Sequence, residues 1–185
     1  IKTCNLPDEY TINTPNLQTL GLKETYVKKL QYGKMDKLKY LSLGLNVIQN
    51  GKEKASPVTV LDLQKSKNIA ELSVTGCRIN KLDLSSVNKT LRLASITQSG
   101  KYPIKQVRLG KMAALKGLSV SAKCAAIDAS KCSRLNTLEC ASYGIFKVKL
   151  PKSVQYLTLT SLDKKGCKSL KLSNCKKLKL SLIHI

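Results

Sequence analysis

The chain has 185 residues, of which 42% are hydrophobic, and its 33 Lys or Arg against 11 Asp or Glu give a formal net charge of +22. It therefore has enough apolar residues to bury a core. Only four of the basic residues are Arg, and the chain has one Phe and no Trp. Sequence-specific nucleic-acid binding is disfavoured, because such proteins use Arg for bidentate contacts and aromatic rings for stacking, although the charge would attract any polyanion.

The opening of the chain repeats a pattern found near its end. Pro follows a run of three spaced apolar residues in both places, in Ile1, Cys4, Leu6 and Pro7 and again in Ile145, Val148, Leu150 and Pro151. We therefore expect the chain to begin in the middle of a repeat, as part of a longer protein whose localisation signals lie elsewhere. No apolar run approaches the roughly 18 residues of a membrane-spanning helix.

Residues 69–84 carry the clearest repeat unit. Counting Ile69 as position 1, apolar residues occupy positions 1, 4, 6, 9, 11, 14 and 16, which fits no single helix or strand period. The spacing is that of one coil of a leucine-rich repeat, in which each apolar side chain points into a core shared with neighbouring coils. Equivalent coils are predicted to start at Leu17, Leu38, Ile69, Asn88, Leu115, Leu135, Val154 and Leu178.

Each coil is predicted to contain two short extended segments. Positions 3–8 form a strand, and the stacked coils join these strands into a parallel sheet with one face inward. Positions 11–16 form a second, shorter stack on the convex side. Helices are expected to be few and brief, because the connecting stretches are short and carry Gly, Pro, Ser and Asn. We expect residues 1–185 to form a single solenoid of about eight coils with parallel strands.

The outward positions of the first strand form one candidate binding face. Most of them are small or hydroxylic, as in Ser73, and the exceptions are Tyr40, Arg92, Glu139 and Tyr156. We interpret these five as ligand-binding residues. The alternative is that Ser and Thr simply suit an exposed strand.

Insertions at 49–57, 97–103 and 163–166 form a second candidate. All three follow position 9 of their coils, so we expect them to project from one edge of the solenoid as a rim. The rim would offer Lys52, Lys54, Lys101, Tyr102, Lys164 and Lys165 to a ligand. Neutral tolerance of longer surface loops is the competing interpretation.

Basic residues also recur on the second segment of each coil. Their side chains would form a Lys-rich convex or lateral surface. This surface either keeps the protein soluble without binding a partner or binds an anionic polymer. The basic residues are Lys28, Lys29, Lys81, Lys105, Arg108, Lys147, Lys149, Lys168 and Lys171.

The seven cysteines are predicted to be buried free thiols. They fall at inward positions, their number is odd, no C-x-x-C occurs and His184 is the only histidine. A disulfide framework and a zinc site are therefore disfavoured. We predict no metal, no cofactor and no catalytic residue, since nothing pairs a nucleophile with a base and no phosphate-binding glycine loop is present. Asp62, Asp83 and Asp128 recur at position 15, which favours a role in turns.

The elements Leu-Asp-Leu-Ser, Ser-Lys-Cys-x-x-Leu-x-x-Leu-x-Cys and Leu-Ser-Asn-Cys-Lys-Lys-Leu resemble the leucine-rich repeats of secreted and surface-anchored proteins of Gram-positive, often gut-dwelling bacteria, similar in build to internalins. The resemblance covers essentially the whole chain. It implies a right-handed curved solenoid, of the α/β horseshoe class but mostly β, that binds proteins or glycans outside the cell. The chain departs from the repeat at position 9, which is Asn or Cys only at Asn46 and Cys77.

We therefore expect a non-enzymatic extracellular or cell-surface binding module that recognises a protein or glycan through the concave strand face and the rim. The alternative is a structural or wall-associated module that binds anionic polymer through its Lys-rich surface. The sequence predicts neither the ligand nor the oligomeric state.

Overall fold

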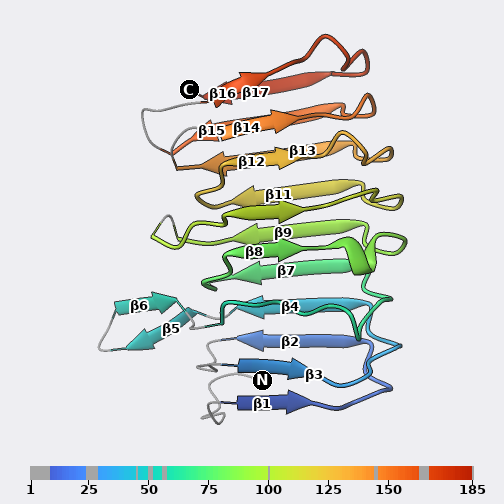
Figure 1. Cartoon of the computed structure of the whole chain (residues 1–185), viewed down its shortest axis with the longest axis vertical. Helices are drawn as coiled ribbons and strands as arrows, with labels where there is room; N and C mark the ends of the chain where they lie inside the picture. The colour runs from blue at the N-terminus through green and yellow to red at the C-terminus, as the bar shows by residue number, and fades with distance from the viewer. Residues whose placement is uncertain are drawn as a thin grey trace.

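The computed structural model describes residues 9–23, 29–44, 46–49, 52–55, 58–99, 101–143, 146–162 and 167–184. The fold is an all-β parallel β-solenoid of about six turns with a repeat of about 21 residues. Figure 1 shows the coils stacked along the long axis of the molecule, with the N-terminal strands at one end and the C-terminal strands at the other.

Eight parallel strands form the main sheet. Their order in the sheet follows the order of the chain. They are β2 (Thr19–Lys23), β4 (Tyr40–Gly44), β7 (Glu71–Thr75), β9 (Leu93–Thr97), β11 (Gly117–Ser121), β13 (Thr137–Ser142), β15 (Tyr156–Ser161) and β17 (Leu180–His184).

Shorter strands run back along the opposite side of the solenoid and pair in parallel in three groups. The first pair is β1 (Glu9–Ile12) with β3 (Lys29–Tyr32), the second is β8 (Lys81–Asp83) with β10 (Gln106–Arg108), and β12 (Ala126–Asp128), β14 (Phe146–Lys149) and β16 (Cys167–Leu170) form the third. The described part of the chain contains no α-helix, only the 3-10 turn η1 (Ser85–Val87), and no helix long and apolar enough to cross a membrane.

The core lies between the two stacks of strands. Successive side chains of a strand point to opposite faces, so alternate residues of each main-sheet strand enter the core. In β7, for example, Leu72 and Val74 are 3% and 1% exposed. The inward positions predicted for the coils that start at Ile69, Leu115, Leu135 and Val154 are confirmed, since the following residues at them are buried: Leu72, Val74, Leu82, Leu118, Val120, Leu138, Cys140, Leu157 and Leu159.

The predicted number of about eight coils is too high. A turn is complete only where a main-sheet strand and its return strand both join the stack, so the eight predicted starts overcount the roughly six turns. The start at Asn88 is also wrong by three residues. Leu93 pairs with both Glu71 and Gly117, so Leu91, which is fully buried, occupies position 1. The turn η1 and the residues after it account for the three residues by which the coil starts later than predicted.

The insertion 49–57 was predicted as a loop, but it contributes to a hairpin. The strands β5 (Asn46–Gln49) and β6 (Lys52–Ala55) pair antiparallel. The hairpin stands beside the solenoid next to β4 (Figure 1). Because the two strands pair with each other, the extra residues form backbone hydrogen bonds outside the stack. The predicted half-repeat at residues 1–7 lies outside the described residues.

Three aspartates close turns, as predicted. In each, Oδ1 accepts a hydrogen bond from the backbone N–H two residues later. The donors are Gln64 to Asp62, Ser85 to Asp83 and Ser130 to Asp128. The side-chain hydrogen bond from Ser130 and the nearby Lys149 lower the pKa of Asp128. Burial acts to raise the pKa of Asp83, but hydrogen bonds from Ser85 and the charge of Arg108 outweigh it and lower the pKa.

Five cysteines are described with their side chains, and all five are buried with free thiols: Cys77, Cys124, Cys132, Cys140 and Cys175. Burial raises the pKa of the Cys77 thiol to about 12. It also raises the pKa values of Cys124, Cys132 and Cys175. These thiols therefore act as small apolar side chains in the core. Cys4 and the side chain of Cys167 lie outside the described residues.

We predict that Leu72→Ala lowers the free energy of unfolding by about 2–5 kcal/mol, because it opens a cavity in the core. Leu93→Ala is the matched control, since Leu93 is 48% exposed, and should cost less than about 1 kcal/mol. Urea denaturation followed by circular dichroism measures both. Equal losses in the two variants would contradict the assignment of inward and outward positions.

We predict that seven thiols titrate after denaturation and that the described five react slowly in the native protein at pH 8. The folded state keeps the Cys77 thiol protonated up to about pH 12, whereas an unfolded thiol loses its proton near pH 8.5. The free energy of unfolding should therefore be level below about pH 8.5 and fall as the pH rises above it. Chelator and mild reductant should leave the melting temperature unchanged; fewer than seven thiols would reveal a disulfide.

Candidate functional site

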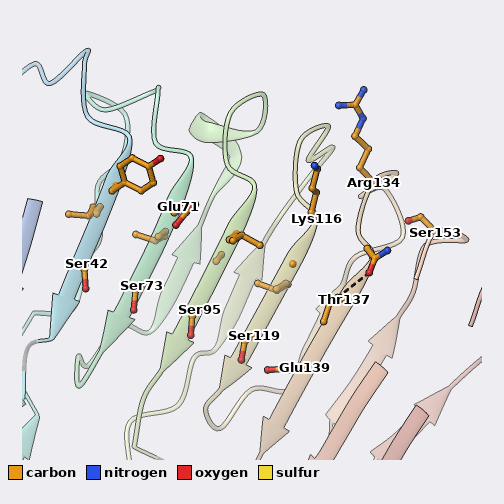
Figure 2. A pocket seen from close by; sticks show the side chains of 18 of the residues that line it. Ser42, Glu71, Ser73, Ser95, Lys116, Ser119, Arg134, Thr137, Glu139 and Ser153 are labelled. Atoms are coloured by element: carbon orange, nitrogen blue, oxygen red, sulfur yellow. Dashed lines mark hydrogen bonds between the residues drawn. The ribbon is translucent and has the colours of Figure 1, made fainter. Parts of the chain in front are cut away.

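The outer face of the main sheet carries side chains in rows, because neighbouring strands pair residue by residue. One row consists of Ser42, Ser73, Ser95 and Ser119, which are Cα partners on β4, β7, β9 and β11, and Glu139 of β13 continues it. Figure 2 shows these side chains in a row across the strands. Adjacent members lie on strands about 4.8 Å apart. The row therefore presents hydroxyl groups at a regular spacing.

A groove of about 1130 Å³ lies over this face. At its centre the exposed Leu93 side chain stands beside Gly117, its Cα partner. A Cβ atom on Gly117 would lie only 2.8 Å from Cδ2 of Leu93, so the glycine leaves room for the leucine. The result is an apolar spot surrounded by polar side chains.

Charged groups of both signs border the groove. Glu71 and Glu139 supply carboxylates from the strands. Lys116 and Arg134 reach it from the turns that precede β11 and β13, where Figure 2 shows them at the N-terminal ends of the strands. A bound molecule would therefore meet an apolar centre, a row of hydroxyls, and carboxylate and cationic groups at separate places.

The predicted strand-face residues are partly brought together. Tyr40, Ser73 and Glu139 line the groove. Tyr156 lies on the same outer face and is exposed, but it is not part of the groove lining. Arg92 was predicted within the strand, and this is wrong, because the three-residue shift of its coil places it just before β9. For the same reason Ala94, which the predicted start at Asn88 would put at the outward position 7, is buried.

The predicted rim is described in part. The β5–β6 hairpin and the loop between β9 and β10 project from the same edge in Figure 1, the edge where the main-sheet strands end. Lys101 is exposed. The side chains of Lys52 and Lys54, and all of Lys164 and Lys165, lie outside the described residues. This edge is opposite the turns that bring Lys116 and Arg134 to the groove, so the rim and the groove are separate surfaces.

Tyr102 on the rim is held by its neighbours. The guanidinium of Arg78 lies 4.7 Å from the centre of its ring, a cation–π contact. Its backbone carbonyl accepts a hydrogen bond from Gln98 Nε2. Tyr102 therefore has a structural role in the loop.

Gln98 and Ser142 are polar residues that the sequence analysis missed. Gln98 is 3% exposed; its Oε1 accepts a hydrogen bond from Ile79 N at 2.9 Å, and its Nε2 donates to Ile79 O at 2.8 Å. Ser142 bonds the backbone of Cys124 in the same two directions. Each residue lies at position 8 of its coil, at the end of the main-sheet strand, and its side chain bonds the turn of the preceding coil. A polar residue that recurs at position 8 is the sequence signal that could have identified them.

The opposite edge, where the chain turns into each main-sheet strand, is strongly basic. We call it the turn edge; it comprises residues 13–18, 33–39, 64–70, 84–92, 109–116, 129–136, 150–155 and 171–179. These segments contain 16 Lys or Arg, all with exposed side chains, and one acidic residue, Asp36, whose Oδ2 lies 3.1 Å from Lys34 Nζ. A pocket of about 620 Å³ on this edge is lined by Lys37, Lys39, Lys89 and Arg92 among others.

The predicted Lys-rich surface on the return strands is exposed but partly neutralised. Arg108 lies 3.6 Å from Asp83, and Lys149 lies 3.2 Å from Asp128. Lys81, Lys105, Lys147 and Lys171 are exposed. Lys28 and the side chains of Lys29 and Lys168 lie outside the described residues.

Within the described ranges, no three His, Cys, Asp or Glu side chains gather as metal ligands do. Comparison with protein-family models, with curated proteins and with solved structures finds no match for this chain.

We predict that Gln98→Ala lowers the free energy of unfolding by about 2–4 kcal/mol, because it leaves the buried N–H and C=O of Ile79 without their partner. Ser99→Ala in the same exposed loop is the control and should change stability by less than about 0.5 kcal/mol. Thermal and urea unfolding measure both. A loss from Gln98→Ala as small as that of the control would contradict the bridging role.

Proposed function

We propose that this chain is a non-enzymatic binding module that holds its partner on the outer face of the main sheet. The observation that carries the proposal is the groove over that face, with an exposed leucine at its centre and charged groups of both signs at its border. Exposed apolar side chains surrounded by polar ones are typical of recognition surfaces.

A scaffold argument supports the same face. The groove lining comes from strands joined in a continuous ladder, from Thr19 in β2 to Gln155 beside β15. A rigid sheet holds such side chains in place before a partner arrives, which reduces the entropy lost on binding. The aromatic ring of Tyr40 and the apolar Leu93 supply contact area, while the serine row supplies hydrogen-bond donors and acceptors.

These groups suit a protein or a glycan. Hydroxyls and carboxylates bond sugar hydroxyls, and the leucine with its neighbouring glycine accommodates an apolar side chain or a sugar face. The cations of Lys116 and Arg134 and the carboxylates of Glu71 and Glu139 would orient a polar partner. We propose no cofactor and no catalytic residue.

The repeat pattern supports a finer proposal, that the solenoid belongs to the leucine-rich repeats of secreted or cell-surface bacterial proteins. The supporting observation is the spacing of apolar residues in 69–84, all of which are buried: Ile69, Leu72, Val74, Cys77, Ile79, Leu82 and Leu84. An extracellular location is proposed on the same resemblance.

We predict that Ser95→Arg weakens the binding of a partner at least tenfold, because the long side chain fills the groove. The partner is first identified by screening the immobilised wild-type chain against a glycan array and a panel of extracellular proteins. Titration calorimetry then compares the variants.

Thr97→Arg is the matched control. Thr97 lies on the same strand and the same outer face two residues later, it is exposed, and it is not part of the groove lining. The Thr97→Arg variant gains the same charge as Ser95→Arg, but outside the groove. Its affinity for the partner should therefore stay within about twofold of the wild type. Equal weakening by both variants, or none by Ser95→Arg, would contradict the groove as the site.

A further inference from the structure

We propose that the turn edge is a second binding site, for a linear polymer that carries sulfate or phosphate groups. The turn edge borders the groove and shares Lys116 and Arg134 with it. The proposed ligand has a different chemistry, however, and the test below changes residues that do not line the groove. It also differs from the expectation drawn from the sequence, which placed a polyanion on the return strands.

Charge concentration is the first observation. The turn edge holds 16 exposed cations and one carboxylate, which Lys34 already neutralises. Its net charge of +15 is two thirds of the +22 of the whole chain. Like charges this close repel one another, so the edge costs folding free energy that a bound polyanion would offset. The return strands differ, because Asp83 and Asp128 pair with their basic neighbours.

The second observation is the regular spacing of the turns that carry the cations. The residue before each main-sheet strand is hydrogen-bonded through its backbone to its equivalent in the coil before, as Lys116 N is to Arg92 O at 2.8 Å. Neighbouring equivalents are therefore about 4.8 Å apart. From Lys39 to Lys179 the ladder crosses six strand steps, or about 29 Å, and four of its seven residues are cations: Lys39, Arg92, Lys116 and Lys179. Cations spread over such a length match a chain molecule better than a single small anion.

The pocket on this edge supplies the third observation. Lys37 and Lys39 come from one turn and Lys89 and Arg92 from the next turn but one, and they line the same hollow with Asp36. The turns are fixed relative to one another, because Asn68 Nδ2 donates to the backbone carbonyl of Asp36 and Thr90 Oγ1 donates to that of Lys67. An anionic group in the pocket would meet several cations at once, without the cost of ordering the backbone.

The eight segments of the turn edge contain no aromatic residue, and the pocket on it is lined by a single ring, that of Tyr40 at the start of β4. Proteins that bind single-stranded nucleic acid add base stacking on several aromatic rings to the backbone contacts. Apart from Tyr40 the turn edge offers charge, mostly from Lys, which acts as a point charge toward sulfate or phosphate, and this favours a polymer without bases. The shared chemistry is therefore a chain of anionic groups, as in a sulfated polysaccharide or a polyphosphate.

The test compares two variants of equal net charge. The edge variant carries Lys37→Gln, Lys39→Gln, Lys89→Gln and Arg92→Gln. The control variant carries Lys81→Gln, Lys105→Gln, Lys123→Gln and Lys147→Gln, all of which are exposed and lie away from the turn edge. Binding of heparin fragments of graded length and of inorganic polyphosphate is measured by fluorescence titration over a range of salt concentrations.

The edge variant should bind the longer probes at least tenfold more weakly, and the slope of log Kd against log salt concentration should fall by about two to three, since each phosphate contact contributes about 0.7. The control variant should change the slope by less than one. For the wild type, affinity should rise with fragment length and level off once the probe spans the edge. Tighter binding of heparin than of polyphosphate, or the reverse, tells which of the two groups the edge prefers.

Three results would overturn the proposal. Equal losses in the two variants would mean that the whole surface attracts polyanions without a site. An affinity that does not depend on fragment length would exclude a linear ligand. Binding of a single-stranded oligonucleotide tenfold tighter than any polymer without bases would assign the edge to nucleic acid. Each of these outcomes leaves the test of the groove by Ser95→Arg unaffected.

Discussion

The structure depends on the stacking of coils in register around one apolar core. Each coil alone buries little, and it becomes stable because its inward residues contact those of the coils before and after it. Parallel pairing fixes the register, since a slip of one residue would turn Leu72 and Val74 outward and their polar neighbours inward. Five buried cysteines serve the same packing, and burial raises the pKa of four of their thiols: Cys77, Cys124, Cys132 and Cys175.

This constraint also arranges the surface. When inward positions are fixed coil by coil, every outward position repeats along the axis as well. Stacking in register brings residues that are far apart in sequence to the same side of the solenoid. It produces both the row from Ser42 to Glu139 and the cations of the turn edge. Two surfaces of different character result: a groove with an apolar centre on the main sheet, and a nearly uncompensated line of positive charge beside it.

The sequence predicted the features that depend on the spacing of apolar residues. The strands, their parallel order and the buried residues followed from it. The phase of one coil did not, because Leu91 and Leu93 fit positions 4 and 6 of a coil that starts at Asn88, and Leu91 equally fits position 1, until the turn at Ser85–Val87 is known. The β5–β6 hairpin was missed because its polar residues pair with each other and leave no apolar repeat.

The candidate sites were harder to predict than the core. Tyr40, Ser73 and Glu139 were found because they lie at outward strand positions. Gln98 was missed because a single polar residue beside a turn has no period of its own. The turn edge was missed because its lysines fall between the repeat positions and come together only when the coils stack.

The register of the main sheet is the central claim, and NMR measures it most directly. Nuclear Overhauser contacts between backbone protons should link Ser73 with Ser95 and Ser95 with Ser119, as the parallel pairing requires. Contacts that place Arg92 in the serine row instead of Ser95 would contradict this register. They would restore a coil starting at Asn88 and remove Leu93 from the centre of the groove.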